Sequence, residues 1–286
     1  MVKPAEWREK EAGPSLVKPA SPPCCHYSVR VKRERNATAA GYNGPLTLSI
    51  VIPAYNEERR LPSTLDVILA WLDTAPYQDV ELLIVDDGST DATAAIVESR
   101  AASEPRLRLI RNPGNRGKGY AVRHGMLEAK GDWILSSDAD LSAPIEELPK
   151  LLAAAEQQGA AIAIGSRALD RTLIGVHQSQ WREMSGIVFN GVMRLTTGLP
   201  FADTQCGFKL FRRDAASRVF KLQRLDGFSF DVEDLFIART LEIPTIEVPV
   251  RWNNVEGTKV SLLQGIASFL DLLRVRWNWL QGRYTV

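Results

Sequence analysis

The chain has little cysteine or histidine and no long apolar run. Its 286 residues include three cysteines, Cys24, Cys25 and Cys206, and three histidines. An odd cysteine count with two adjacent members suits neither a disulfide framework nor a zinc site, so we expect a reducing, cytoplasmic setting. No uninterrupted run of about 18 apolar residues occurs, and therefore no membrane-spanning helix is expected. Proline and charged residues interrupt the first positions, which argues against a signal peptide.

An excess of either charge is also absent. Lysine and arginine total 35 and aspartate and glutamate total 34, so bulk charge indicates no nucleic-acid partner. The apolar fraction of 45% and the charged fraction of 24% are ordinary for a globular protein. Any basic binding site must therefore be local.

Three segments of the chain differ in composition and in apolar pattern. Residues 1–45 are rich in proline and charge and lack a sustained period, which predicts a disordered leader. Residues 46–260 carry the regular apolar pattern of one folded domain. Residues 261–286 have an amphipathic helical pattern in which Trp277 and Trp279 suit a membrane interface. For this helix we expect either peripheral attachment to the cytoplasmic face of a membrane, or packing on the core or a second subunit.

Five short apolar runs alternate with helical patterns. The runs are "LSIVIPA" (48–54), "VELLIV" (80–85), "LRLI" (107–110), "DWILSS" (132–137) and "AAIAIG" (160–165). Continuous apolar strands that alternate with helices predict an α/β fold, with a mostly parallel central sheet and helices on both faces. Ligands of such sheets bind beyond the carboxyl ends of the strands.

The segments that follow these strands are polar. They are "PAYNE" (53–57), "DDGSTD" (86–91), "NPGNRGKG" (112–119), "SDADL" (137–141) and "GSR" (165–167). Each by itself is compatible with ordinary turn chemistry. Five in succession at the same edge of one sheet predict a binding site there.

Two of these segments carry the residues expected to bind a diphosphate and a metal ion. Asp138 and Asp140, separated by Ala139, place two carboxylates on one loop, and carboxylate oxygens suit Mg²⁺ or Mn²⁺ that bridges to substrate phosphates. Arg116 and Lys118 lie between glycines at the start of a helix, where backbone N–H groups favour phosphate. Solvated turns and cations are the simpler alternative for each.

Three further charged residues complete the expected donor site. Arg167 ends the fifth strand and is placed to reach the same diphosphate. Asp86 and Asp87 follow the second strand, and ionised carboxylates accept hydrogen bonds from a uracil N–H or ribose hydroxyls. We therefore expect Asp86 and Asp87 to hold a nucleoside, unless Asp87 only forms a turn with Gly88.

Taken together and in order, these motifs resemble a known family. "IVIPAYNE", "VDDGSTD", "NRGKG", "DAD" and "GSR" are similar to the inverting glycosyltransferases of family two, which have the GT-A fold; the resemblance spans roughly residues 47–260. Within that family, "DTQCGFKLF", "GFSFDVE" and "EGTK" resemble the dolichyl-phosphate β-glucosyltransferase branch. Those enzymes move glucose from UDP-glucose to a polyprenyl phosphate.

The resemblance implies roles for individual residues. The nucleotide-sugar pocket would be lined by Pro53, Ala54, Tyr55, Glu57, Asp86 and Asp87. Asp138 and Asp140 would bind the divalent ion. The acceptor side would include Gln205 and the segment from Phe228 to Glu233. Apart from the resemblance, Lys259 in "EGTK" is a candidate to hold an acceptor phosphate, with a solvated loop lysine as the alternative. Asp231 is the candidate for orienting the acceptor or taking its proton, and Asp140 and Arg167 would join it in the catalytic set.

The motifs define the chemistry better than the substrates. A phosphate acceptor is already anionic near pH 7 and needs no strong general base, whereas a sugar hydroxyl needs a carboxylate to take its proton. GDP-mannose as donor and a glycan or glycolipid hydroxyl as acceptor therefore remain alternatives to UDP-glucose and polyprenyl phosphate. A nucleotide-binding scaffold without activity is a further alternative, and the intact DAD motif argues against it.

Overall fold

A computed structural model describes residues 47–77, 79–176, 180–255 and 262–285. The expected leader, residues 1–45, lies outside the described residues, and so does Lys259. Within the described part, none of the helices combines the length and apolar character needed to cross a bilayer.

Strands and helices alternate through the first half of the chain, as expected. The strands are β1 (Thr47–Ala54), β2 (Asp79–Asp86), β3 (Leu107–Arg111), β4 (Trp133–Ser136), β5 (Ile162–Ser166), β6 (Ile174–Val176), β7 (Lys209–Arg212), β8 (Thr245–Pro249) and β9 (Trp252–Asn253). The α-helices are α1 (Leu61–Leu72), α2 (Thr93–Ala101), α3 (Lys118–Glu128), α4 (Leu148–Gln158), α5 (Gln180–Thr197), α6 (Arg213–Leu222), α7 (Phe230–Thr240) and α8 (Leu262–Leu280). Two 3₁₀ helices cover Ile145–Glu147 and Arg171–Leu173.

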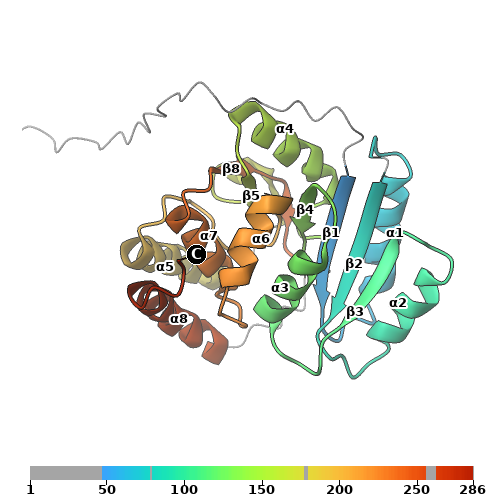
Figure 1. Ribbon diagram of the computed structural model, residues 1–286, viewed down its shortest axis with the longest axis horizontal. Helices are drawn as coiled ribbons and strands as arrows, with labels where there is room; N and C mark the ends of the chain where they lie inside the picture. Colours follow the sequence, from blue (N-terminus) through green and yellow to red (C-terminus); the bar gives the residue numbers. More distant parts are fainter. Residues whose placement is uncertain (1–46, 78, 177–179, 256–261, 286) are drawn as a thin grey trace, which may run out of the picture. The chain divides into compact units, whose positions relative to one another are not determined.

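Seven strands form one mixed sheet in the order β3-β2-β1-β4-β7-β5-β8 (Figure 1). Strands β1 to β4 pair in parallel, and β5 pairs in parallel with β8. Strand β7 lies antiparallel between β4 and β5, so the expectation of a mostly parallel sheet is confirmed with one reversed strand. A separate pair joins β6 to β9.

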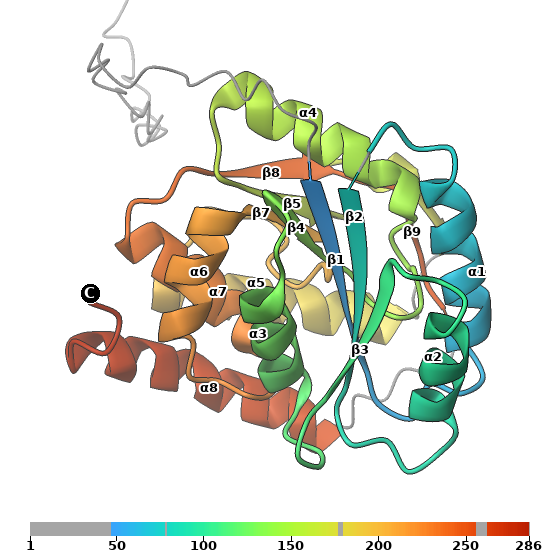
Figure 2. The ribbon, with the colours of Figure 1, turned by 45° about the vertical axis from the view of Figure 1, so that its right-hand side comes forward.

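The strands are apolar throughout because both of their faces are covered. Ile50 and Ile52 of β1 pack into one core layer with α1, α2 and α4, whereas Val51 packs into the other layer with α3, α6 and α7. Figure 2 shows these two groups of helices on opposite sides of β1 and β2. A two-sided sheet of this kind removes the polar–apolar alternation that a one-sided sheet shows.

The C-terminal helix α8 belongs to the second of these layers. Leu272 and Val275 are fully buried, and α8 packs against α5 and α7. One side of α8 therefore packs on the core, which is one of the alternatives expected for this helix. The opposite side remains exposed, and it is considered below.

The strand order reverses direction at β1. The chain proceeds outward from β1 to β2 and β3, and then returns to place β4 on the other side of β1. A crevice opens at such a switch point, beyond the carboxyl ends of the two central strands. The segments after β1 and β4, "PAYNE" and "SDADL", both begin at this edge of the sheet, because the two strands are adjacent and parallel.

Gly88 should tolerate no side chain, since its φ is +74° and an added Cβ would overlap the backbone of Gly114. We expect Gly88→Ala to lower the free energy of unfolding by about 2 kcal/mol more than Gly159→Ala. Gly159 is the matched control because its φ is +63° but nothing lies within 4 Å of its added Cβ. Urea unfolding of both variants measures the difference, and equal losses would show that the contact with Gly114 is unimportant.

Candidate functional site

Asp87 organises the glycine-rich loop that precedes α3. Its Oδ1 accepts hydrogen bonds from Asn112 Nδ2 at 2.8 Å and Arg116 N at 3.1 Å, and its Oδ2 accepts one from Gly117 N at 2.7 Å. The residue is 3% exposed. Its carboxylate thus holds a loop, a placement that differs from the expected contact with a nucleoside.

The segments after β1 and β2 are joined to each other. Asp87 N donates to Ala54 O at 2.8 Å, and Asn56 N donates to Ser89 Oγ at 2.9 Å. Asp86 is buried, and its Oδ1 accepts from Ser89 N at 3.0 Å. The two segments expected to bind the nucleotide therefore form one structural unit.

The exposure of the "PAYNE" side chains varies along the segment. Tyr55 is 37% exposed, Pro53 and Glu57 are half-buried, and Ala54 is buried. Tyr55 offers an accessible ring at the carboxyl end of β1. The methyl group of Ala54 is buried, and its backbone carbonyl accepts the hydrogen bond from Asp87 N.

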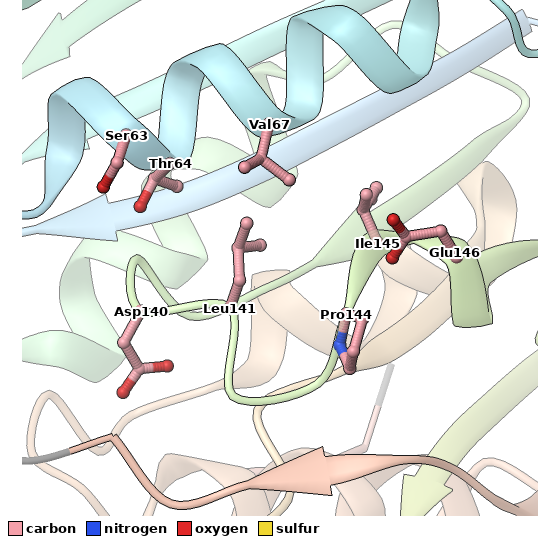
Figure 3. Close-up of a pocket in the computed structure, with 8 residues that line it drawn as sticks. All are labelled: Ser63, Thr64, Val67, Asp140, Leu141, Pro144, Ile145 and Glu146. Carbon is pink, nitrogen blue, oxygen red and sulfur yellow. The ribbon is translucent and has the colours of Figure 1, made fainter.

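Thr64 of α1 holds the DAD loop through a hydrogen bond to its backbone. Its hydroxyl donates to Ala139 O at 2.6 Å, and Asp140 Oδ1 accepts from Ser142 N at 2.9 Å. Leu141 has a φ of +48°, an unusual backbone conformation for a bulky residue. Figure 3 shows Thr64 directed at this loop, while the side chain of Asp140 points away from α1; both residues line a pocket of about 310 Å³.

Lys118 and Asp138 form the contact that joins two of the expected phosphate-site segments. Lys118 Nζ lies 2.6 Å from Asp138 Oδ1, and the two side chains are 26% and 34% exposed. The Asp138 carboxylate also lies against Gly207, where any Cβ would overlap it. The basic loop before α3 and the acidic loop after β4 thus meet at one point.

A second ion pair lies immediately behind the first. Lys209 of β7 pairs with Asp231 at the start of α7 and also donates to Cys206 O at 2.6 Å. Lys209 is 2% and Asp231 5% exposed. Removing one partner of such a buried pair leaves an uncompensated charge, which costs about 3–5 kcal/mol.

Mutual attraction among these groups sets their charge states. Burial disfavours ionised Lys118, but Asp138, Asp231 and Asp140 outweigh it and hold its pKa above the usual range. Burial likewise opposes ionised Asp138, yet Lys118, Lys209 and Arg167 keep its pKa low. Both members of the Lys118–Asp138 pair are therefore charged at neutral pH.

Asp231 behaves differently from Asp138. Burial raises its pKa, and Asp138 adds to the effect, although Lys209 and Lys118 act in the opposite direction. The net result is a carboxyl group that holds its proton more readily than an exposed aspartate.

Arg167 lies near the Lys118–Asp138 pair, but it forms its own ion pair with Asp203. Its guanidinium makes a two-point contact with Asp203, Nε to Oδ2 at 2.6 Å and Nη2 to Oδ1 at 2.8 Å, and it lies 5.4 Å from the Trp252 ring centroid. The Arg167 side chain is 27% exposed. Its position suits electrostatic support of Asp138, and Asp203 restrains it from swinging freely.

The remaining predicted site residues differ in their exposure to solvent. Arg116 and Gln205 are exposed and Phe228 is half-buried, so these three can be reached from solvent. Glu233 is 0% exposed, and its Oε2 accepts from Arg224 N and Leu225 N. A buried carboxylate committed to backbone N–H groups cannot contact an acceptor, so the expected role of Glu233 does not fit its placement.

Three residues near the site were not anticipated from the sequence. Lys209 is the first residue of β7, directly before the apolar Leu210 and Phe211, and a lysine next to a buried strand is a recognisable signal in the sequence. Asp203, two positions before the noted Gln205, gives a weak signal at best. Thr64 gives none, because a threonine in an amphipathic helix is ordinary until its partner Ala139 is known.

The donor atoms present are compatible with a divalent ion. Asp138 and Asp140 lie on one loop and offer the carboxylate oxygens that Mg²⁺ and Mn²⁺ prefer. Among the described residues, no group of three or more histidine, cysteine, aspartate or glutamate side chains is arranged as a complete metal site. Such an ion would therefore need further ligands, and the phosphate oxygens of a nucleotide are of the right chemical type.

Comparison with known proteins gives consistent matches. The sequence profile of Glycosyl transferase family 2 matches residues 49–220. A dolichyl-phosphate beta-glucosyltransferase of Drosophila melanogaster is 38% identical over 248 residues, which cover 82% of this chain and 72% of that protein. The Mus musculus protein of the same description is 36% identical over 282 residues, or 92% of this chain and 87% of that protein.

A solved structure with the same fold supports these matches. Glucosyl-3-phosphoglycerate synthase from Mycobacterium tuberculosis, in complex with Mn²⁺, UDP-glucose and phosphoglyceric acid, superposes with a TM-score of 0.58 at 20% sequence identity. The superposition covers 84% of this chain and 80% of that chain. The expected GT-A fold is thereby confirmed.

Asp234 should make stability depend on pH. Burial, followed by Glu233 and Asp231, raises its pKa well above the usual range. The folded state therefore keeps a proton that the unfolded chain releases above about pH 4, so the free energy of unfolding falls as pH rises through that window. We expect Asp234→Asn to be increasingly stabilising, relative to the wild type, between pH 4 and the raised pKa.

Thermal unfolding at a series of pH values tests this expectation. Asp79→Asn, which removes a carboxylate at an exposed position, is the matched control. A pH-independent difference for Asp234→Asn would contradict the prediction.

Proposed function

The chain belongs to glycosyltransferase family 2, and from that premise we propose that it transfers glucose from UDP-glucose to a polyprenyl phosphate, with inversion and release of UDP. The relatives that cover most of this chain are described as dolichyl-phosphate beta-glucosyltransferases. The observation that carries the proposal is the Lys118–Asp138 contact, which brings a cation and an acid together at the β1–β4 switch point.

The donor would occupy the carboxyl ends of β1, β2 and β4. Asp86 and Tyr55 would contact the nucleoside, and Asp87 would act indirectly by holding the loop of Arg116 and Lys118. Asp138 and Asp140 would hold Mg²⁺ or Mn²⁺, which would supply charge neutralisation of the departing diphosphate. Lys118 would add a permanent positive charge at the same diphosphate.

The acceptor would approach from the side of β5 and α7. A lipid phosphate is anionic at neutral pH, so transfer needs no strong base. Lys209 and Lys118 offset the charge of Asp138 and Asp231 at this point and would reduce repulsion of the incoming phosphate. Gln205 and Phe228 remain accessible on the same side and would contact the acceptor.

The raised pKa of Asp231 favours a second candidate reaction. A carboxylate with a raised pKa is a better proton acceptor, so transfer to a glycan or glycolipid hydroxyl would use Asp231 as the general base. The two reactions differ in their dependence on this residue. Asp231 would be essential for a hydroxyl acceptor and auxiliary for a phosphate acceptor.

Transfer activity tests the proposal directly. Labelled UDP-glucose, GDP-mannose and other nucleotide sugars are incubated with the protein, a divalent ion and polyprenyl phosphate, and the label in the organic phase is counted. We expect label from UDP-glucose, and a fall of about two to three orders of magnitude in Asp138→Asn and Asp140→Asn. Asp79→Asn is the control, and circular dichroism checks folding.

Several outcomes would overturn parts of this scheme. Label only from GDP-mannose would replace the donor. Undiminished transfer in excess chelator would remove the metal from the reaction. Label that enters glycan or glycolipid products rather than lipid phosphate, and is lost in Asp231→Asn, would favour the second candidate.

The enzyme would reach its lipid acceptor through an apolar surface on two helices. On α8, Leu273, Trp277 and Leu280 are 59%, 60% and 64% exposed and recur at helical spacing. On α5, Ile187 and Leu195 are 59% and 87% exposed. The two helices lie side by side in Figure 1 and pack against each other.

The charge of this surface fits an anionic membrane. Arg194, Arg274 and Arg276 are exposed on the same two helices, whereas Asp271 of α8 is buried and paired with Arg274. Tryptophan and arginine beside an apolar stripe suit the headgroup region of a bilayer. A membrane with anionic lipids is therefore the proposed partner, in peripheral contact.

Liposome flotation tests the surface without removing the helix. Leu273→Gln combined with Trp277→Gln should lower the fraction that floats with anionic liposomes by about ten-fold, because exposed apolar area drives the insertion. Leu127→Gln combined with Leu169→Gln changes residues elsewhere that are 42% and 49% exposed, and this variant should float as the wild type does. Equal flotation of both double variants would exclude the α5–α8 surface as the membrane contact.

A further inference from the structure

Tyr284 is the last large side chain of the described part, and it is completely buried. A turn after α8, in which Gly282 has a φ of +70°, directs the chain back toward α7. The Tyr284 ring lies 6.2 Å from that of Phe236, and its hydroxyl accepts from Asn278 Nδ2 at 3.2 Å. The same hydroxyl donates to Glu233 Oε1.

Glu233 connects this hydroxyl to the loop between α6 and α7. While Oε1 binds Tyr284, Oε2 accepts from Arg224 N at 2.9 Å and Leu225 N at 2.7 Å. One buried carboxylate thus binds two adjacent backbone N–H groups of the loop. An apolar environment makes each of these hydrogen bonds costly to lose.

The loop is seated directly on the start of α3. Asp226 O accepts from Gly119 N at 2.8 Å and from Tyr120 N at 3.3 Å, and a Cβ on Gly117 would overlap the same carbonyl. Gln223 Nε2 also donates to Gly119 O at 2.9 Å. No side-chain layer separates the two backbones, so a shift of the loop moves the start of α3.

Lys118 is the first residue of α3, and it contacts Asp138. A continuous set of contacts thus runs from Tyr284 through Glu233 and the 223–229 loop to the start of α3, where Lys118 lies. Its steps are hydrogen bonds, a backbone contact and, at Lys118, an ion pair. This series of contacts begins in the turn after α8, the helix that carries the proposed membrane surface.

We propose that Tyr284 is a positioning residue that, through Glu233, holds the 223–229 loop and the start of α3 so that Lys118 stays aligned with Asp138. The consequence for transfer rests on the function proposed above. Because Tyr284 follows α8 directly, the same contacts link the helix that would meet the lipid to the group that would meet the diphosphate.

Hydrogen exchange tests the structural half of the proposal without any substrate. In Tyr284→Phe, which keeps the ring and removes the hydroxyl, we expect amides in 117–121 and 223–229 to exchange on the order of ten-fold faster. Asn278→Ser, which removes the second partner of the hydroxyl, should change the same segments less. Tyr77→Phe is the matched control, because Tyr77 is a half-buried tyrosine on the far side of the sheet.

The result separates positioning from general support of the fold. Selective acceleration in 117–121 and 223–229 supports the proposal. Unchanged exchange in these segments overturns it, and so does equal acceleration throughout α7 and α8, which is the result expected of a purely structural tyrosine.

Steady-state kinetics test the functional half. A displaced Lys118 would weaken stabilisation of the departing diphosphate, so kcat of Tyr284→Phe should fall on the order of ten-fold while KM for the lipid acceptor stays the same. An unchanged kcat together with accelerated exchange would overturn the positioning role. If the wild type transfers no sugar from any donor, the proposed function fails instead, and the exchange result alone decides whether Tyr284 holds Lys118.

Discussion

The contact between Lys118 and Asp138 is the interaction on which the candidate site depends. It joins the glycine-rich loop before α3 to the acidic loop after β4, two segments that the chain reaches 20 residues apart. Each group keeps the other ionised in a partly buried place, where an isolated charge would be unfavourable. In the proposed reaction, a diphosphate with its divalent ion would take over this balance of charge.

Neighbouring side chains hold the two loops that carry Lys118 and Asp138. Asp87 holds the loop of Lys118, Thr64 holds the loop of Asp138, and Lys209 with Asp231 closes the side toward α7. Most of these contacts use backbone atoms, which leave few torsions free to adjust. Rigid support of this kind provides the preorganised charge that electrostatic catalysis requires.

The same arrangement relates the site to the surface of the molecule. Helix α8 is buried on the side of Leu272 and exposed on the side of Trp277, so it is both part of the core and a candidate membrane contact. Tyr284, in the turn that follows α8, is buried inside the protein. An enzyme whose acceptor is a lipid would benefit from such a connection between the surface that meets the bilayer and the residues that meet the donor.

The sequence alone determined the order of strands and helices, the carboxyl-end location of the polar segments and the family, because these follow from apolar periodicity and from local motifs such as DAD. It also placed Asp138 and Lys118 near one another through the rule for parallel sheets. Only the tertiary structure decided that Asp87 holds a loop, that Glu233 is buried and that Tyr284 reaches it. Those outcomes depend on which atoms of distant segments compete for the same hydrogen bonds, and spacing along a chain does not encode that competition.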